Sequence, residues 1–95
     1  MNAHYEDALK NLISKMQTTG GVYNYDLVKK AFSICIEAHS GQKRISGEEY
    51  YNHPYQVALI LVDLGMDSKS IAAALLHDVV EDTGYTLQYI EEQIY

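Results

Sequence analysis

The sequence predicts an all-α fold, a small bundle of about five helices. Apolar residues recur at helical spacing along almost the whole chain, and no segment alternates in the manner of a β-strand. Glycines at Gly20-Gly21 and Gly65 mark the ends of two of these apolar stretches. A chain of 95 residues can enclose only a modest core. We therefore expect residues 1–95 to belong to a single domain.

Five helices account for the spacing. Their approximate ranges are 5–16, 26–39, 53–64, 68–81 and a last helix from residue 86. Pro54 suits the beginning of the third helix, and Asp67 can cap the fourth. Tyr85 and Ile90 are placed for a hydrophobic staple at the start of the fifth. A polar loop that contains Gly41 and Gly47 joins the second helix to the third.

Composition excludes several classes of partner. The chain has 13 acidic and 7 basic residues and a net charge of -6, which argues against a nucleic-acid surface or an anionic membrane. Cys35 is the single cysteine, so neither an internal disulfide nor a thiolate metal cluster can form. The chain shows no signal-type or membrane-length apolar segment. We expect a cytoplasmic protein.

Four polar residues crowd the end of the predicted fourth helix, which is otherwise made of Ala, Leu and Val. Residues three and four apart share a helix face, so His77 lies beside Glu81, and Asp78 lies beside Glu81 and Asp82. Like charges at this spacing repel, but imidazole and carboxylate together suit a divalent transition metal such as manganese or iron. The partial negative charge at a helix C-terminus also favours a cation there.

His53 joins this group through the geometry of a helical hairpin. The short turn at residues 65–67 makes the third and fourth helices antiparallel neighbours. At about 1.5 Å per residue, His53 and Asp78 both lie roughly 15 to 18 Å from that turn. A capping histidine and an exposed polar helix end would explain His77 and Asp78 alone, but the convergence of His53 favours a metal site. Glu81 and Asp82, one turn further on, could then position or deprotonate an attacking water.

The polar loop carries the adjacent basic pair Lys43-Arg44. The planar guanidinium of Arg44 could stack on a base or grip a phosphate, although an ordinary exposed loop is an equal alternative. His4 and His39 lack partners at ligand spacing, and we expect them to be structural or on the surface. Tyr50 and its neighbour Tyr51 could wall a pocket, but packing is the safer interpretation.

The chain resembles the HD-type hydrolase domain of the RelA/SpoT family over about residues 25 to 95. The matching motifs occur in order and are Ala38-His39-Ser40-Gly41-Gln42-Lys43-Arg44-Ile45-Ser46-Gly47-Glu48, then Tyr50, then His53-Pro54, then Ala73-Ala74-Leu75-Leu76-His77-Asp78-Val79-Val80-Glu81-Asp82-Thr83. The resemblance implies an HD-domain-like helical bundle. It also implies removal of the 3′-pyrophosphate from the alarmone (p)ppGpp with Mn²⁺.

The resemblance assigns roles to single residues. His53, His77 and Asp78 would be metal ligands. Glu81 and Asp82 would handle the attacking water and the proton transfer. Arg44 would contact the guanine nucleotide, with Ser46 nearby.

The chain departs from the family's pattern in three places. Ile45 stands where a basic or polar residue is common, and Glu49 stands where proline is usual. The family's fourth metal ligand is an aspartate on a later helix, and this chain stops at Tyr95 before that helix. We therefore expect a partial, N-terminal portion of the hydrolase domain, with weak or no turnover and with apolar surface that favours self-association.

Three alternatives stay open at this point. The first is an HD phosphohydrolase of another nucleotide, and the second is a non-catalytic module that binds metal or nucleotide. The third is a DNA-binding helix-turn-helix at residues 64–72, which the net negative charge disfavours.

Overall fold

The computed structural model describes residues 3–43 and 45–94, and the side chains of all of these except residues 3, 81, 82 and 94. Within these residues the secondary structure consists of six α-helices and one isolated bridge between Lys43 and Glu49, so the predicted all-α class is confirmed. The helices are α1 (Ala3–Thr19), α2 (Tyr25–Ala38), α3 (Asn52–Asp63), α4 (Ser68–Leu76), α5 (Val79–Asp82) and α6 (Leu87–Ile94).

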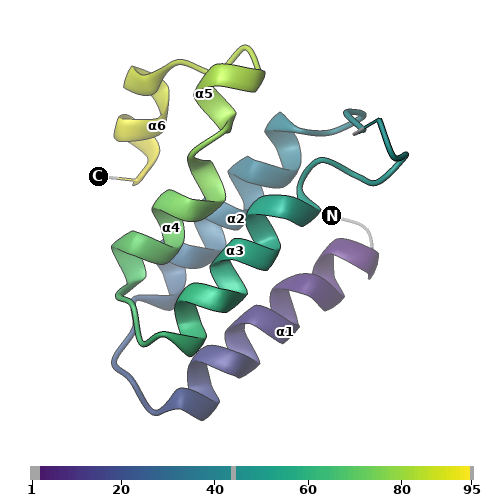
Figure 1. The fold of residues 1–95 in the computed structure, drawn as a ribbon. Coiled ribbons are helices and arrows are strands. Elements are labelled where there is room, and N and C mark those ends of the chain that lie inside the picture. The colour runs from purple at the N-terminus through teal and green to yellow at the C-terminus, as the bar shows by residue number, and fades with distance from the viewer. Residues whose placement is uncertain (1–2, 44, 95) are drawn as a thin grey trace.

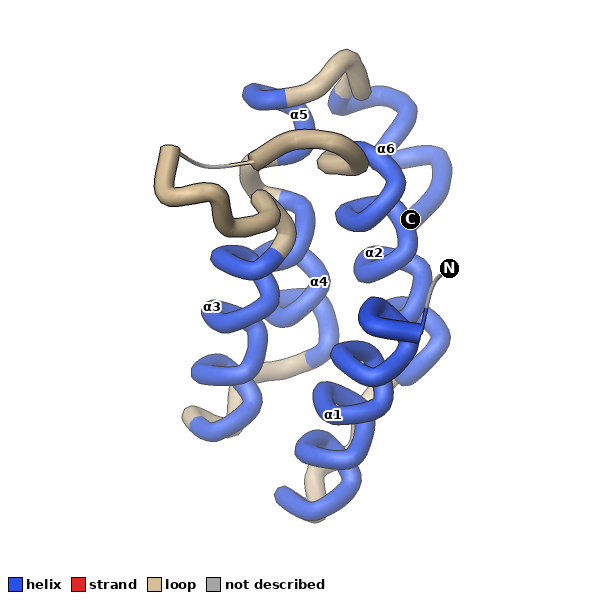
Figure 2. The backbone as a smooth tube through the Cα atoms, turned by 90° about the vertical axis from the view of Figure 1, so that its right-hand side faces the viewer, coloured by secondary structure: helices blue, strands red, loops and turns tan. Residues whose placement is uncertain are grey.

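Helices α1 to α4 run alternately down and up (Figure 1). The α1–α2 loop and the α3–α4 turn lie together at the lower end of this bundle, and the α2–α3 loop and the α4–α5 junction lie at the upper end (Figures 1 and 2). Helix α2 packs on α4, which also packs on α3, and α1 contacts both α2 and α3. Helix α6 returns against α2. This up-and-down order places both predicted sites at one end.

The apolar stripes of the helices meet in one core. Its largest fully buried side chains include Leu12, Met16, Phe32, Ile71 and Leu75. The ring of Phe32 meets the rings of Tyr55 and Tyr51 edge-on, at centroid distances of 6.2 Å and 6.3 Å. Such edge-to-face pairs stabilise a core beyond the area that they bury.

The lower end of the bundle is closed by side-chain caps. Asn24 Oδ1 accepts from the Leu27 N–H at 3.1 Å, and Asp67 Oδ1 accepts from the Ser70 N–H at 2.8 Å. The hydrogen bonds from Ser70 hold the pKa of Asp67 below its ordinary value. The Asn24 N–H also donates to the buried Ser68 Oγ at 2.7 Å, which ties the start of α2 to the start of α4. The predicted cap at Asp67 is confirmed.

The structure corrects the predicted fourth helix, because the regular helix stops at Leu76 and resumes as the short α5. The prediction of about five helices therefore becomes six in the described part of the chain. The side chain of His77 supplies a physical reason, since its Nδ1 lies 3.2 Å from the carbonyl oxygen of Ala74. That oxygen is the one that the Asp78 N–H would bond in a continuous helix, and a side chain that competes for it favours an interruption.

Helix α1 extends beyond the predicted range 5–16 at both ends, and the boundaries of α2, α3 and α6 shift by about one residue. Helix α3 begins at Asn52, so Pro54 lies in its first turn, where the missing N–H costs little. Helix α6 begins at Leu87, and Thr86 Oγ1 accepts from the Tyr89 N–H at 3.1 Å, as an N-cap does. Ile90 is buried and Tyr85 packs against the same core, as the staple requires. No helix within the described residues combines the length and apolar character that crossing a membrane requires.

Candidate metal centre and nucleotide loop

Two histidines from different helices meet at the upper end of the bundle. His53 is the second residue of α3, and His77 directly follows the last residue of α4. Their ring centroids lie 6.4 Å apart, as the equal arms of the helical hairpin predict. Both side chains are exposed, His77 at 52%. The two imidazoles are therefore within reach of a common ligand from solvent.

The surroundings of His77 decide which of its ring nitrogens is available. A carbonyl oxygen can only accept, so the contact with Ala74 requires that Nδ1 carries a proton and donates. In the neutral ring Nε2 then holds a lone pair, and this atom lies 3.1 Å from Asp78 Oδ1. Two acceptor atoms at that distance repel each other through their lone pairs, so a second ring proton or a cation between them is needed to offset the repulsion. A backbone carbonyl that orients the ring in this way is the usual support of a metal-bound histidine.

One pair of donors has a separation that a divalent cation would accept. Two ligand atoms about 2.1 Å from an ion and at right angles to each other are about 3.0 Å apart, which is close to the observed separation of His77 Nε2 and Asp78 Oδ1. Among the side chains that the structure describes, however, no three of His, Cys, Asp and Glu are gathered closely enough to hold an ion. The described arrangement thus offers one preformed pair, with His53 beside it.

Three predicted residues cannot be placed in full. Glu81 and Asp82 belong to the short helix α5, one turn beyond Asp78, but their side chains lie outside the described part. Arg44 lies outside the described residues altogether. Their assigned roles therefore stay predictions.

Ser46 lines a cavity formed by the loop between α2 and α3. The cavity has a volume of about 610 Å³, and its walls are Lys43, Ile45, Ser46, Glu48 and Tyr50. Gly41 and Gly47 have φ angles of 81° and 88°, a region in which other residues are strained, and they let the loop turn back on itself. The loop closes through the Tyr50 N–H, which donates to the Gln42 carbonyl oxygen at 3.3 Å.

His39 is a contributor to this loop that sequence reasoning did not assign to it. Its ring stacks on Tyr50 at a centroid distance of 5.1 Å and an interplanar angle of 17°. Its Nδ1 lies 2.9 Å from Gln42 Oε1, and its Nε2 is buried without a hydrogen-bond partner among the described residues. His39 is thus structural, as predicted, while Tyr50 both packs and lines the cavity. Only the residue order, a histidine before the loop and a tyrosine at its end, hints at the stack.

Cys35 lies on α2 near Asp78. Burial, together with the nearby charge of Asp78, raises the pKa of the Cys35 thiol to about 12. The sulfur is fully buried and protonated at neutral pH, so it does not compete with imidazole and carboxylate for a cation.

Comparisons with known proteins identify the family. Residues 31–94 match the family described as HD domain. The chain is 50% identical over 70 residues to "Probable GTP pyrophosphokinase" of Mycobacterium leprae, which is 74% of this chain and 9% of that protein. It is 42% identical over 81 residues to "GTP pyrophosphokinase rsh" of Brucella ovis, covering 85% of this chain and 11% of the relative.

A plant relative gives the same result. "Putative GTP diphosphokinase RSH1, chloroplastic" of Arabidopsis thaliana is 51% identical over 69 residues, or 72% of this chain and 8% of that protein. The chain thus spans about a tenth of the length of these relatives, and the resemblance to the HD region of RelA/SpoT proteins is confirmed.

Proposed function

Because the chain belongs to the HD domain family, we propose that it carries part of a metal-dependent site that hydrolyses the 3′-pyrophosphate of the alarmone (p)ppGpp. The observation that carries this proposal is the His77–Asp78 pair, which needs a proton or cation, with His53 beside it and a loop cavity at the same end of the bundle. The similarity to proteins named GTP pyrophosphokinases supports a guanine nucleotide as the substrate class.

His53, His77 and Asp78 are the residues that would hold the cation, and Mn²⁺ is the ion that we expect. A divalent cation at this position supplies Lewis acidity and neutralises phosphate charge, which an acidic chain of net charge -6 cannot do alone. The Ala74 carbonyl would orient the ring of His77 through Nδ1 and leave Nε2, beside Asp78 Oδ1, for this purpose.

The remaining residues act on the nucleotide and on water. Arg44 and Ser46 hold the guanine nucleotide against the loop. Glu81 or Asp82 accepts the proton of the attacking water as it bonds to the phosphorus attached to the 3′-oxygen. The bond between that oxygen and phosphorus breaks, the 3′-oxygen takes up a proton, and pyrophosphate leaves.

A second candidate is a module that binds metal or nucleotide without turnover. It is favoured by the lack of any three gathered donors among the described side chains, since a cation with too few protein ligands is held loosely. Exposed apolar side chains on α3 and the following turn, Ile60, Leu64 and Met66, are consistent with the self-association that the sequence predicts.

The deciding experiment measures pyrophosphate release from ppGpp with and without Mn²⁺. The wild-type chain is compared with His77→Ala, and Lys69→Ala, an exposed residue of α4, serves as the matched control. Release, expected to be weak, supports the proposal if it depends on the metal, is lost in His77→Ala and is kept in Lys69→Ala. Release that is independent of metal, or unchanged in His77→Ala, contradicts the proposal. Mn²⁺ binding without release supports the second candidate.

A further inference from the structure

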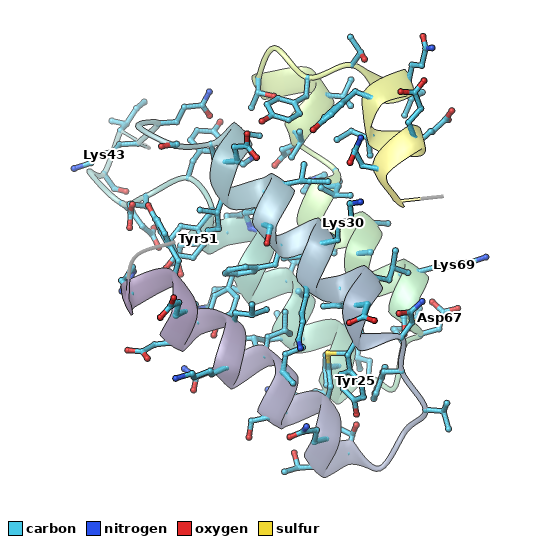
Figure 3. All side chains as sticks on the ribbon, turned by 180° about the vertical axis from the view of Figure 1, so that it is seen from behind. Tyr25, Lys30, Lys43, Tyr51, Asp67 and Lys69 are labelled. Carbon is cyan, nitrogen blue, oxygen red and sulfur yellow. The ribbon has the colours of Figure 1, made fainter. Side chains whose placement is uncertain are left out.

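The first turn of α1 contacts the far end of the loop between α2 and α3, which we call the nucleotide loop. The Tyr5 phenol donates to Glu49 Oε1 at 2.5 Å. His4 Nε2 lies 2.7 Å from the Tyr51 hydroxyl and 3.6 Å from Glu49 Oε2. Figure 3 shows Tyr51 above the start of α1, with Lys43 at the outer side of the loop. We call His4, Tyr5, Glu49 and Tyr51 the clasp.

The clasp rests on the core. Tyr51 is only 5% exposed, and its ring meets Tyr5 edge-on at a centroid distance of 5.1 Å and Phe32 at 6.3 Å. The hydrogen bond to Glu49 is the main cause that raises the pKa of Tyr5 to about 12. The phenol therefore stays protonated and keeps donating to the carboxylate through the whole neutral range. A charge-assisted hydrogen bond of this kind is stronger than one between neutral groups.

Glu49 connects the clasp to the cavity. It forms the isolated bridge with Lys43, which lines the cavity, and it immediately precedes Tyr50, which lines the same cavity and stacks on His39. The loop is thus held at two points, by His39 from α2 and by the clasp from α1. A change in the position of Glu49 is therefore expected to displace Lys43 and Tyr50, which line the cavity.

We propose that the first turn of α1 positions the nucleotide loop through the clasp, with Tyr5 and His4 as positioning residues that set the affinity for the guanine nucleotide. This inference rests on the proposed function. It also gives a reason for Glu49, which stands where the resembling family usually has proline, because proline has no side-chain acceptor for Tyr5.

The test measures ppGpp binding by titration calorimetry for Tyr5→Phe, Glu49→Ala and Glu49→Gln. Tyr5→Phe keeps the ring and Glu49→Ala removes the acceptor, and each is expected to weaken ppGpp binding about tenfold. Glu49→Gln keeps an oxygen that accepts from Tyr5 and is expected to retain most of the affinity. Glu6→Ala, in the same turn of α1 but outside the clasp, is the matched control and should bind as the wild type does.

Two further readouts separate positioning from loss of fold. The affinity for Mn²⁺ alone should be equal in all four variants, because none of the substituted residues belongs to the donor set His53, His77 and Asp78. Hydrogen exchange of the Tyr50 amide, which closes the loop onto Gln42, should be faster in Tyr5→Phe than in Glu6→Ala.

The outcomes are distinct. Equal ppGpp affinity in the wild type, Tyr5→Phe and Glu49→Ala overturns the inference and leaves the proposed function standing. If the wild type binds no ppGpp, the proposed function fails, and with it the role in nucleotide affinity. In that case hydrogen exchange of the Tyr50 amide decides whether the clasp holds the loop. Exchange that is no faster in Tyr5→Phe than in Glu6→Ala overturns this structural role as well.

Discussion

At the lower end of the bundle both helices that begin there, α2 and α4, have side-chain caps, from Asn24 and Asp67. At the upper end the N-cap residues of α3 and α5, Tyr51 and Asp78, make no side-chain cap bond in the described part of the chain, while Thr86 caps α6. The lower end has a partly buried hydrogen bond that joins two helix starts, whereas the upper end has a buried nitrogen, His39 Nε2, without a hydrogen-bond partner among the described residues.

The difference shows where stability and function are placed in this fold. Side chains at the lower end satisfy backbone groups of their own helices, which stabilises the folded state. Polar side chains at the upper end face a loop cavity and one another. In the described residues two helix starts there lack a side-chain cap, and one buried nitrogen lacks a hydrogen-bond partner. Such local violations are expected where a protein binds or reacts with a ligand. Three measurements can break or sharpen this contrast.

The largest expected effect concerns Cys35, which lies under the upper end. A thiol with a pKa of about 12 in place of 9.0 has about a thousandfold less thiolate at pH 8. We expect a thiol reagent to label Cys35 only when the whole chain unfolds, so the urea midpoint of labelling should equal that of circular dichroism. Labelling at clearly lower urea concentration would show that the upper end opens separately from the rest of the chain. The two ends would then differ in the stability of the core as well as in their helix caps.

The next effect is at the lower end. Ser68→Ala removes the acceptor of the Asn24 N–H in a partly buried place, and we expect a loss of about 1–3 kcal/mol in the free energy of unfolding. Urea denaturation measures it, with Lys69→Ala on the same helix as the control, expected within about 0.5 kcal/mol of the wild type. A Ser68→Ala variant as stable as the control would remove the argument that this hydrogen bond closes the lower end.

The smallest effect is expected at the upper end. Asp78→Asn keeps the shape of the side chain and removes a charge that makes no cap, so the free energy of unfolding in metal-free buffer should change by less than about 0.5 kcal/mol. The same variant should bind Mn²⁺ more weakly. A large loss of stability without metal would mean that Asp78 supports the fold, and the contrast between the ends would disappear.

The helices and their antiparallel order could be predicted because apolar periodicity and capping residues are local signals. His53 and His77 lie at similar distances along their helices from the turn at Gly65, so the predicted helices also predict that the two residues are neighbours. The structure places their rings side by side. The HD family assignment also followed from local motifs. The metal-ligand roles stay predictions, since no three donors are gathered among the described side chains.

The parts that could not be predicted depend on contacts between distant residues. The stack of His39 on Tyr50 and the contact of Tyr5 with Glu49, 44 positions apart, leave no periodic pattern in the sequence. The break after Leu76 depends on the side-chain conformation of His77, and local helix propensity in an Ala-Leu-Val stretch points the other way. Tertiary contacts decided the first two of these features, and a local contact three residues back accompanies the third.

The number of residues in α3 and in α4, counted from the turn at Gly65, sets the positions of His53 and His77 relative to each other. Deleting one residue within either helix shortens that arm by about 1.5 Å and turns everything beyond the deletion by about 100°. His53 would then face away from His77, although every chemical group would still be present. We therefore expect related chains to vary in the length of their loops and to keep the number of residues between His53 and His77 unchanged.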